Sequence, residues 1–167
     1  IVQQGDDAGY FLGVDGHGLP GFKVQVGDRW EELVSEERLE RNRWVHVAGT
    51  YDAESGAMAL YVDGALAGTR GIAAGPIQTT RDAVQVGKGK RRPPVDPVRA
   101  NTFEASYGLD ALIDEVRIYD RALEARTIAR LYEQLRPDDP SGPDMEHRLL
   151  PEAASTGRFG ARYTHLK

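Results

Sequence analysis

Three acidic residues, Asp110, Asp114 and Glu115, form the nearest approach in this 167-residue sequence to a pair of catalytic carboxylates. Retaining glycoside hydrolases hold two carboxyl groups about 5–5.5 Å apart, and inverting enzymes hold them about 6.5–9.5 Å apart. Asp110 and Asp114 would share one face of an extended strand, but four residues of strand span about 13 Å. Glu115 would point to the opposite face. The spacing therefore predicts no glycosidase site here.

Other catalytic signatures are missing from the sequence. The chain has no cysteine, which excludes disulfides, thiolate metal sites and a cysteine nucleophile. Its four histidines lack the H-E-x-x-H spacing of zinc proteases, and no G-x-S-x-G elbow occurs. His46 lies beside Trp44 on an expected strand, and we interpret it as structural. These absences favour a non-catalytic domain.

Aromatic side chains that stack on sugar rings, together with planar polar groups, are the residues expected of a carbohydrate site. The basic, proline-rich segment 88–107 is expected to form a long exposed loop, and such loops are often functional. It supplies the candidate carbohydrate-binding residues Tyr107, Phe103, Asn101, Arg99 and Arg92. The expected strand tyrosines Tyr10, Tyr61 and Tyr119 could line a concave face, although packing with the hydroxyl at the rim is the preferred alternative. Trp44 is expected in the core, and Trp30 is undecided.

Residues 43–64 are the stretch around which the other elements are arranged. Trp44–Tyr51 and Met58–Val62 have the composition and alternation of two antiparallel strands, joined by the polar turn Asp52–Gly56. The dipeptide Asp63-Gly64 is favoured in a two-residue hairpin turn because both positions tolerate positive φ. A further strand, Ala65–Thr69, is expected to follow it.

The remaining elements are mostly short strands separated by turn residues. Upstream strands are expected at 1–4, 10–14, 22–26 and 30–35, with a charged surface loop at 36–42. Leu112–Tyr119 is the clearest late strand, and Leu123–Leu135 has helical spacing. The sequence predicts an all-β fold, a two-sheet antiparallel β-sandwich with one short C-terminal helix.

Composition limits the partners. Hydrophobic residues make up 40% of the chain and charged residues 28%, as in ordinary globular proteins. The net charge of −5 does not favour binding to nucleic acid. No apolar run approaches the roughly 20 residues that a membrane-spanning helix needs, so no membrane insertion is expected. The sequence begins at Ile1 rather than Met, which is compatible with a removed leader.

Two blocks carry a family resemblance. The motif W-x-H-V-A-x-T-Y-D followed by L-Y-V-D-G in residues 44–64, and the block 108–132, resemble the laminin G-like jelly-roll domains of the concanavalin A-like lectin/glucanase group. Residues 77–87 are similar to that family's strand ending in a glycine. The resemblance covers residues 1–135. Such domains have further strands ahead of the segment that Ile1 matches, so we expect a longer natural polypeptide or another segment that completes the sheet.

The resemblance gives a sandwich at 1–135. Residues 136–144, rich in Pro, Asp, Ser and Gly, are expected to form a linker, and 145–167 a tail or the start of a following domain. The resemblance implies a non-catalytic, lectin-like module of a larger secreted or surface protein, such as a bacterial glycoside hydrolase. The alternatives are an accessory domain that shapes a neighbouring catalytic domain, or a protein–protein adhesion module. An extracellular or cell-surface location follows from the same resemblance.

Calcium is the cofactor that the resemblance suggests, because laminin G-like domains commonly bind Ca²⁺ through oxygen ligands at the sandwich rim. Asp114 and Asp52 are the candidate ligands, and further aspartates in expected turns are Asp6, Asp7, Asp15 and Asp82. Aspartate is also an ordinary turn residue. For Asp114, which shares its expected strand face with Leu112, Val116 and Ile118, the alternative is a carboxylate that accepts backbone or arginine hydrogen bonds.

Overall fold

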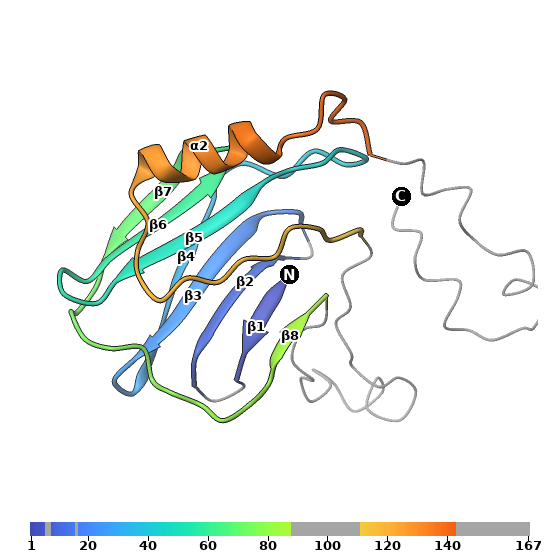
Figure 1. Ribbon diagram of the computed structural model, residues 1–167. Helices are drawn as coiled ribbons and strands as arrows, with labels where there is room; N and C mark the ends of the chain where they lie inside the picture. The colour runs from blue at the N-terminus through green and yellow to red at the C-terminus, as the bar shows by residue number, and fades with distance from the viewer. Residues whose placement is uncertain (6–7, 16, 88–110, 143–167) are drawn as a thin grey trace, which may run out of the picture.

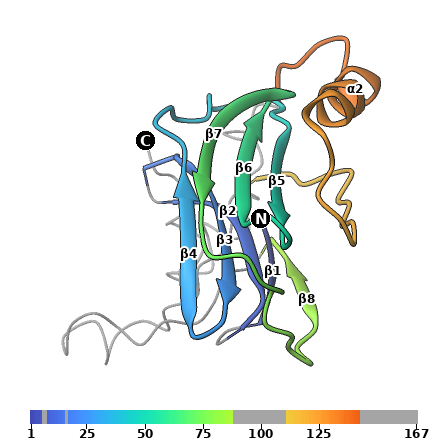
Figure 2. The ribbon, with the colours of Figure 1, turned by 90° about the vertical axis from the view of Figure 1, so that its left-hand side faces the viewer.

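The computed structural model describes residues 1–5, 8–15, 17–87 and 111–142, and it has the all-β architecture expected from the sequence (Figure 1). One sheet has five strands in the order β4-β3-β2-β1-β8, and the other has three in the order β5-β6-β7. All pairs are antiparallel. The two sheets pack face to face, as in a jelly-roll sandwich, with one short helix beside them (Figure 2).

The bounds of the elements agree with most of the expected ranges. The five-stranded sheet consists of β1 (Val2–Gln4), β2 (Tyr10–Val14), β3 (Pro20–Val26), β4 (Arg29–Val34) and β8 (Val84–Val86). The three-stranded sheet consists of β5 (Val47–Asp52), β6 (Ala57–Val62) and β7 (Ala65–Gly71), and the helix is α2 (Ala125–Leu135).

The hydrophobic core lies between β3 and β4 of one sheet and β6 of the other. Its buried members are Phe22, Val24, Leu33, Met58 and Leu60. Val24 and Leu60 are completely shielded from solvent. Because side chains alternate along a strand, the same alternation that buries these residues points Lys23, Gln25, Trp30 and Glu32 to the outer face of the five-stranded sheet.

The hairpin predicted in residues 43–64 is confirmed. β5 pairs with β6 from Val47↔Val62 to Asp52↔Ala57. Asp63 and Gly64 have φ angles of 49° and 75°, as a two-residue turn of this type requires. The predicted start at Trp44 is wrong, because β5 begins at Val47. The backbone N–H of His46 donates to the Asp63 carboxylate and that of Trp44 to the Pro140 carbonyl, so neither N–H pairs with β6.

The predicted late strand Leu112–Tyr119 is also wrong. The segment has no ladder partner among the described residues and contains no strand. Glu115 has a φ of 50°, which interrupts extended backbone, and the Asp114 carboxylate accepts the N–H of Glu115. Leu112, Val116 and Ile118, which were expected to face the core, are exposed. Asp114 is therefore not a carboxylate buried among core residues.

The strand expected to end in a glycine within residues 77–87 is shorter than predicted. Only Val84–Val86 forms a strand, while Ile77 makes an isolated bridge with Val26. Gly87 follows the strand with a φ of 74°, a conformation that favours glycine. Val84 and Val86 point toward the inner side of the sandwich but remain exposed, because β5, β6 and β7 cover β3 and β4 rather than β8.

Helix α2 lies at the end of the three-stranded sheet where β6 turns into β7 (Figures 1 and 2). A Cβ atom at Gly64 of that turn would lie 3.0 Å from Tyr132 Cβ, so the helix rests directly on the turn. Ile128 is its only buried residue. No helix in the described ranges is long and apolar enough to span a bilayer.

The described part of the expected 136–144 linker is in contact with the sandwich. Arg43 and Ser141 form an antiparallel bridge, with 2.7 Å hydrogen bonds from Trp44 N to Pro140 O and from Gly142 N to Asn42 O. The boundaries of the linker and of the 145–167 tail stay predictions, and the tail lies outside the described residues.

Candidate functional site

The five candidate carbohydrate-binding residues, Tyr107, Phe103, Asn101, Arg99 and Arg92, lie outside the described residues, and their role stays a prediction. Asp110 and the turn aspartates Asp6 and Asp7 also lie outside. The chemistry of the described part has to be found on the sheets and at their ends, where strands hold side chains in fixed positions.

The two candidate calcium ligands are engaged with their own turns. Asp52 accepts hydrogen bonds from the Ser55 hydroxyl at 2.7 Å and from the Glu54 N–H at 2.9 Å. Both hydrogen bonds lower the pKa of Asp52, and the bond from the Ser55 hydroxyl has the larger effect. The Asp114 carboxylate accepts the backbone N–H of the next residue, Glu115, in an exposed segment. In the part of the chain that the structure describes, no group of three His, Cys, Asp or Glu side chains could hold a metal ion.

The outer face of β3 and β4 carries the clearest exposed group of aromatic and polar side chains. Lys23 and Glu32 are cross-strand partners whose charged groups lie 2.7 Å apart. Trp30 and Gln25 are the next cross-strand pair on the same face, roughly 7 Å further along the strands. Trp30 keeps 38% of its surface exposed. We call these four residues the β3–β4 outer face.

This surface combines an indole, a planar amide and an ion pair on rigid backbone. The indole offers a flat apolar surface and one N–H donor, while the half-buried amide of Gln25 offers its NH2 donors only, because its oxygen is shielded from solvent. Lys23 and Glu32 neutralise each other, so the surface selects neither anions nor cations strongly. Such an arrangement suits a neutral, hydroxyl-rich ligand.

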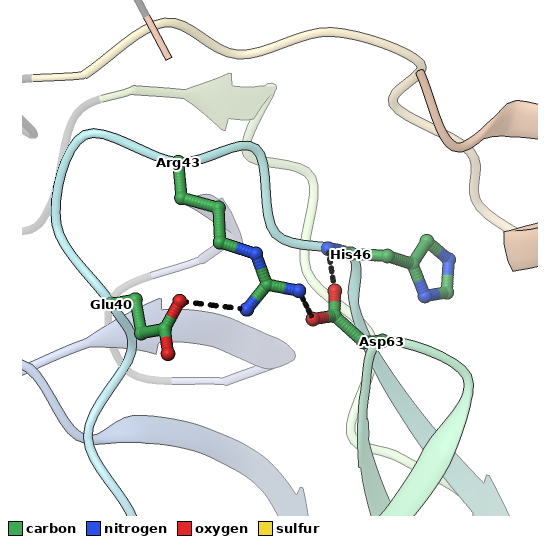
Figure 3. Close-up of polar contacts among 4 residues, drawn as sticks. All are labelled: Glu40, Arg43, His46 and Asp63. Atoms are coloured by element: carbon green, nitrogen blue, oxygen red, sulfur yellow. Dashed lines mark hydrogen bonds and ion pairs between the residues drawn. The ribbon is translucent and has the colours of Figure 1, made fainter. Parts of the chain in front are cut away.

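A second polar group joins the start of β5 to the β6–β7 turn (Figure 3). Asp63 accepts the N–H of His46 through Oδ1 at 3.0 Å and pairs with the Arg43 guanidinium through Oδ2. Asp63 N in turn donates to His46 O at 2.8 Å. Arg43 also contacts Glu40 at 3.1 Å, and Asp63 is the main cause of the raised pKa of Arg43. We call Glu40, Arg43, His46 and Asp63 the turn junction.

The imidazole of His46 faces helix α2. Its ring centroid lies 6.0 Å from that of Tyr132, with the two planes tilted by 42°. His46 Nδ1 is buried and has no hydrogen-bond partner among the described residues. Burial lowers the pKa of His46, and the negative charge of Asp63 opposes that effect only in part. In the turn junction, the acidic and basic groups are bonded to one another and to the backbone. This arrangement indicates a structural role rather than general acid or base catalysis.

The other aromatic residues singled out in the sequence take different places. Tyr10 is half-buried against the core and Tyr61 is buried, in agreement with packing rather than ligand binding. Tyr119 is exposed, on a segment that is not a strand. Trp44, expected in the core, is only half-buried. Trp30, undecided from the sequence, is on the outer face.

Sequence reasoning missed both groups of side chains. The β3–β4 outer face had a usable signal, because Lys23 and Gln25 alternate with core residues just as Trp30 and Glu32 do. The sequence did not give the register of β3 against β4, which places the pair Lys23–Glu32 next to the pair Gln25–Trp30. The contact between Arg43 and Asp63 spans 20 residues and has no local signal.

Comparisons with known proteins place this architecture in a family. A laminin G family described as the Concanavalin A-like lectin/glucanases superfamily matches residues 1–129. Pentraxin-related protein PTX3 from Homo sapiens is 36% identical over 66 residues, which are 39% of this chain and 17% of that protein. This chain therefore matches only a small part of that curated relative.

One solved structure was also matched. The crystal structure of an S-layer domain-containing protein from Clostridium thermocellum superposes with a TM-score of 0.44 and 23% sequence identity, covering 78% of this chain and 66% of the other. The family match, in contrast, extends over most of the sequence and over every described strand. The chain belongs to the concanavalin A-like lectin/glucanases superfamily.

Proposed function

We propose that this domain is a non-catalytic carbohydrate-binding module of a larger secreted or cell-surface protein. Family membership supports a lectin-type domain. The observation that carries the proposal further is the β3–β4 outer face, where exposed Trp30 lies beside the amide of Gln25 and the neutralised pair Lys23–Glu32. This combination suits stacking on a sugar ring with hydrogen bonds to its hydroxyl groups.

The segment 88–107 is a second part of the proposal. Tyr107 and Phe103 supply aromatic rings, and Asn101, Arg99 and Arg92 supply planar polar groups. A calcium site that uses Asp52 or Asp114 is part of the same proposal, and it needs further ligands from outside the described residues, because no group of three His, Cys, Asp or Glu side chains that could hold a metal ion lies within them. No residue of the sandwich is proposed to carry out catalysis. If the parent protein is a glycoside hydrolase, its catalytic carboxylates lie elsewhere in the polypeptide.

Glycan-array binding of the full 167-residue chain tests the proposal. We expect binding to neutral oligosaccharides, and Trp30→Ala should weaken it at least about tenfold, which corresponds to the loss of about 1.4 kcal/mol of aromatic contact. Tyr119→Ala is the matched control, because Tyr119 is also an exposed aromatic residue but lies outside the β3–β4 outer face.

The glycan array also distinguishes between the two proposed binding sites, the β3–β4 outer face and the segment 88–107. Loss of binding in Tyr107→Ala or Phe103→Ala, with Trp30→Ala unaffected, would move the site to the segment 88–107. A folded wild-type chain without signal on any glycan, measured with and without calcium, would rule out carbohydrate binding as the function of this domain.

A specific observation favours a second candidate, an accessory or adhesion module that packs on a neighbouring polypeptide. The segment 111–120 crosses the side of the sandwich between β5 and β8 (Figures 1 and 2). Exposed apolar side chains gather on this segment and on β8, and we call them the open side: Val84, Val86, Leu112, Val116, Ile118 and Tyr119. Exposed apolar patches of this kind often mark interaction surfaces.

The parent protein distinguishes this candidate from a free lectin. If the open side contacts a neighbouring domain, hydrogen exchange should show protection of residues 111–120 in the parent polypeptide and none in the isolated chain. The β5–β6 hairpin (47–62) is the internal reference and should be equally protected in both. Equal exchange of residues 111–120 in both proteins would contradict the accessory role.

A further inference from the structure

Helix α2 depends on its contacts with the sandwich. It has no side-chain hydrogen bond at its N-cap, no acidic residue in its first turn and no basic residue in its last turn. An isolated helix of eleven residues is marginal in water, so packing must hold it. That packing includes burial of Ile128, the contact of Tyr132 with the β6–β7 turn and the ring contact between Tyr132 and His46.

His46 is the titratable group in that contact. From the β6–β7 turn, Asp63 accepts the backbone N–H of His46, and its negative charge is the one that acts on the imidazole. Arg43 and Glu40, from the preceding segment, lie on the other side of Asp63, and the imidazole points away from them (Figure 3). From α2 it meets the phenol of Tyr132, while Arg136 and Glu133 at the end of the helix pair with each other at 2.9 Å. The Asp63 carboxylate is already engaged with the His46 backbone and Arg43.

A charged imidazolium fits this place poorly. Both ring nitrogens of a protonated histidine are donors, yet Nδ1 is buried without an acceptor among the described residues. Burial of an unsatisfied charged donor costs more than burial of the neutral ring. Undocking of α2 would expose the ring to water and relieve that cost.

We propose that His46 is a pH-sensitive latch: the neutral imidazole holds α2 and the following residues 136–142 on the turn junction, and its protonation releases them. The release starts at α2 because the helix has a single buried residue, whereas the β5–β6 hairpin carries Met58 and Leu60 of the core. Elements with few buried contacts open first. The pairing of 140–142 with 42–44 would loosen together with the helix.

The sign of the effect follows from the lowered pKa of docked His46. The undocked, hydrated ring titrates at its ordinary value of about 6.5. Docking is therefore strongest above that pH and weakens as the pH falls below it, because the undocked state binds the proton more readily. The loss is complete once the pH lies below the pKa of docked His46.

Hydrogen exchange of the full chain at pH 7.5 and 5.0, corrected for intrinsic rates, tests the latch. We expect the protection of residues 125–135 to fall several-fold at pH 5.0, with a ceiling of about thirtyfold set by the ordinary imidazole pKa. Residues 47–62 should keep their protection. His46→Phe retains a ring against Tyr132 without titrating, so it should abolish the pH dependence, whereas exposed His17→Gln should leave it unchanged.

Two results would overturn the latch: unchanged protection of α2 at pH 5.0 in the wild-type chain, or the same pH dependence in His46→Phe. An NMR titration of the wild-type imidazole gives a second test that needs no variant. The His46 pKa should lie below that of a free histidine, and the α2 amide signals should follow the same transition. An unshifted or raised pKa would refute the proposal.

Discussion

At the scale of single residues, close approaches in the core decide which substitutions the sandwich tolerates. A methyl group at Gly49 would lie 2.5 Å from ring atoms of Phe22, whereas at Gly71 it would meet nothing within 4 Å. Gly49→Ala should therefore lower the free energy of unfolding by about 1–3 kcal/mol, and Gly71→Ala should change it by less than about 0.5 kcal/mol. Urea denaturation measures both, and equal effects would contradict this account of the core.

The turn junction gives a second prediction at this scale. Asp63→Asn keeps an oxygen acceptor for His46 N–H and tolerates positive φ, but it removes the charge that faces Arg43. The two side chains are 30% and 19% exposed, so we expect a loss of about 1 kcal/mol that shrinks in high salt. Asp63→Ala should cost about 2 kcal/mol, because it also removes the hydrogen bond. The reverse order in denaturant unfolding would contradict this role.

At the scale of elements, α2 combines a regular apolar stripe with a weak start. Glu124 is the N-cap residue and makes no side-chain hydrogen bond to the helix. The helix forms nevertheless, since Ile128 and Tyr132 pack on the sandwich.

A better cap should strengthen that helix. Glu124→Ser supplies a hydroxyl acceptor for the first-turn N–H groups, so we expect α2 to be stabilised by about 0.5–1 kcal/mol. Slower hydrogen exchange of residues 125–135 at pH 7.5 would report the gain. Glu124→Ala removes the same carboxylate without supplying a cap and should give no gain. If both variants slow exchange equally, capping is not the cause.

At the scale of the whole molecule, the sandwich is covered unevenly. The three-stranded sheet lies over β3 and β4, and Arg70 of β7 reaches Glu31 of β4 at 2.8 Å to join the two layers at that edge. On the other side, β8 and residues 111–120 keep apolar side chains exposed. The core and the open side should therefore respond differently to substitution.

Lysine substitutions on the open side test that difference. Val116→Lys and Ile118→Lys should each change the free energy of unfolding by less than about 0.5 kcal/mol, because both side chains are already exposed, at 42% and 54%. Leu60→Ala in the core should cost about 2–5 kcal/mol. Denaturant unfolding compares them, and binding of a hydrophobic dye should fall only in the lysine variants. A large loss of stability in Ile118→Lys would mean that this segment belongs to the core.

The sequence alone determined the features that depend on neighbouring residues. Alternation of apolar side chains and turn residues specified the hairpin strands around Asp52–Gly56 and Asp63-Gly64, and helical spacing specified α2. In both cases the interacting groups are close in the chain, so local chemistry is sufficient. The motifs in 44–64 and 108–132 specified the superfamily.

Only the tertiary structure decided what depends on distant partners. Leu112–Tyr119 alternates like a strand, yet a strand exists only where another edge pairs with it, and no described residue does. The register of β3 against β4 put Trp30 beside Gln25, and the turn at Asp63 brought its carboxylate to Arg43 and His46. These contacts join segments that are distant in the sequence and meet only in the folded chain. The pattern of neighbouring residues therefore cannot predict them.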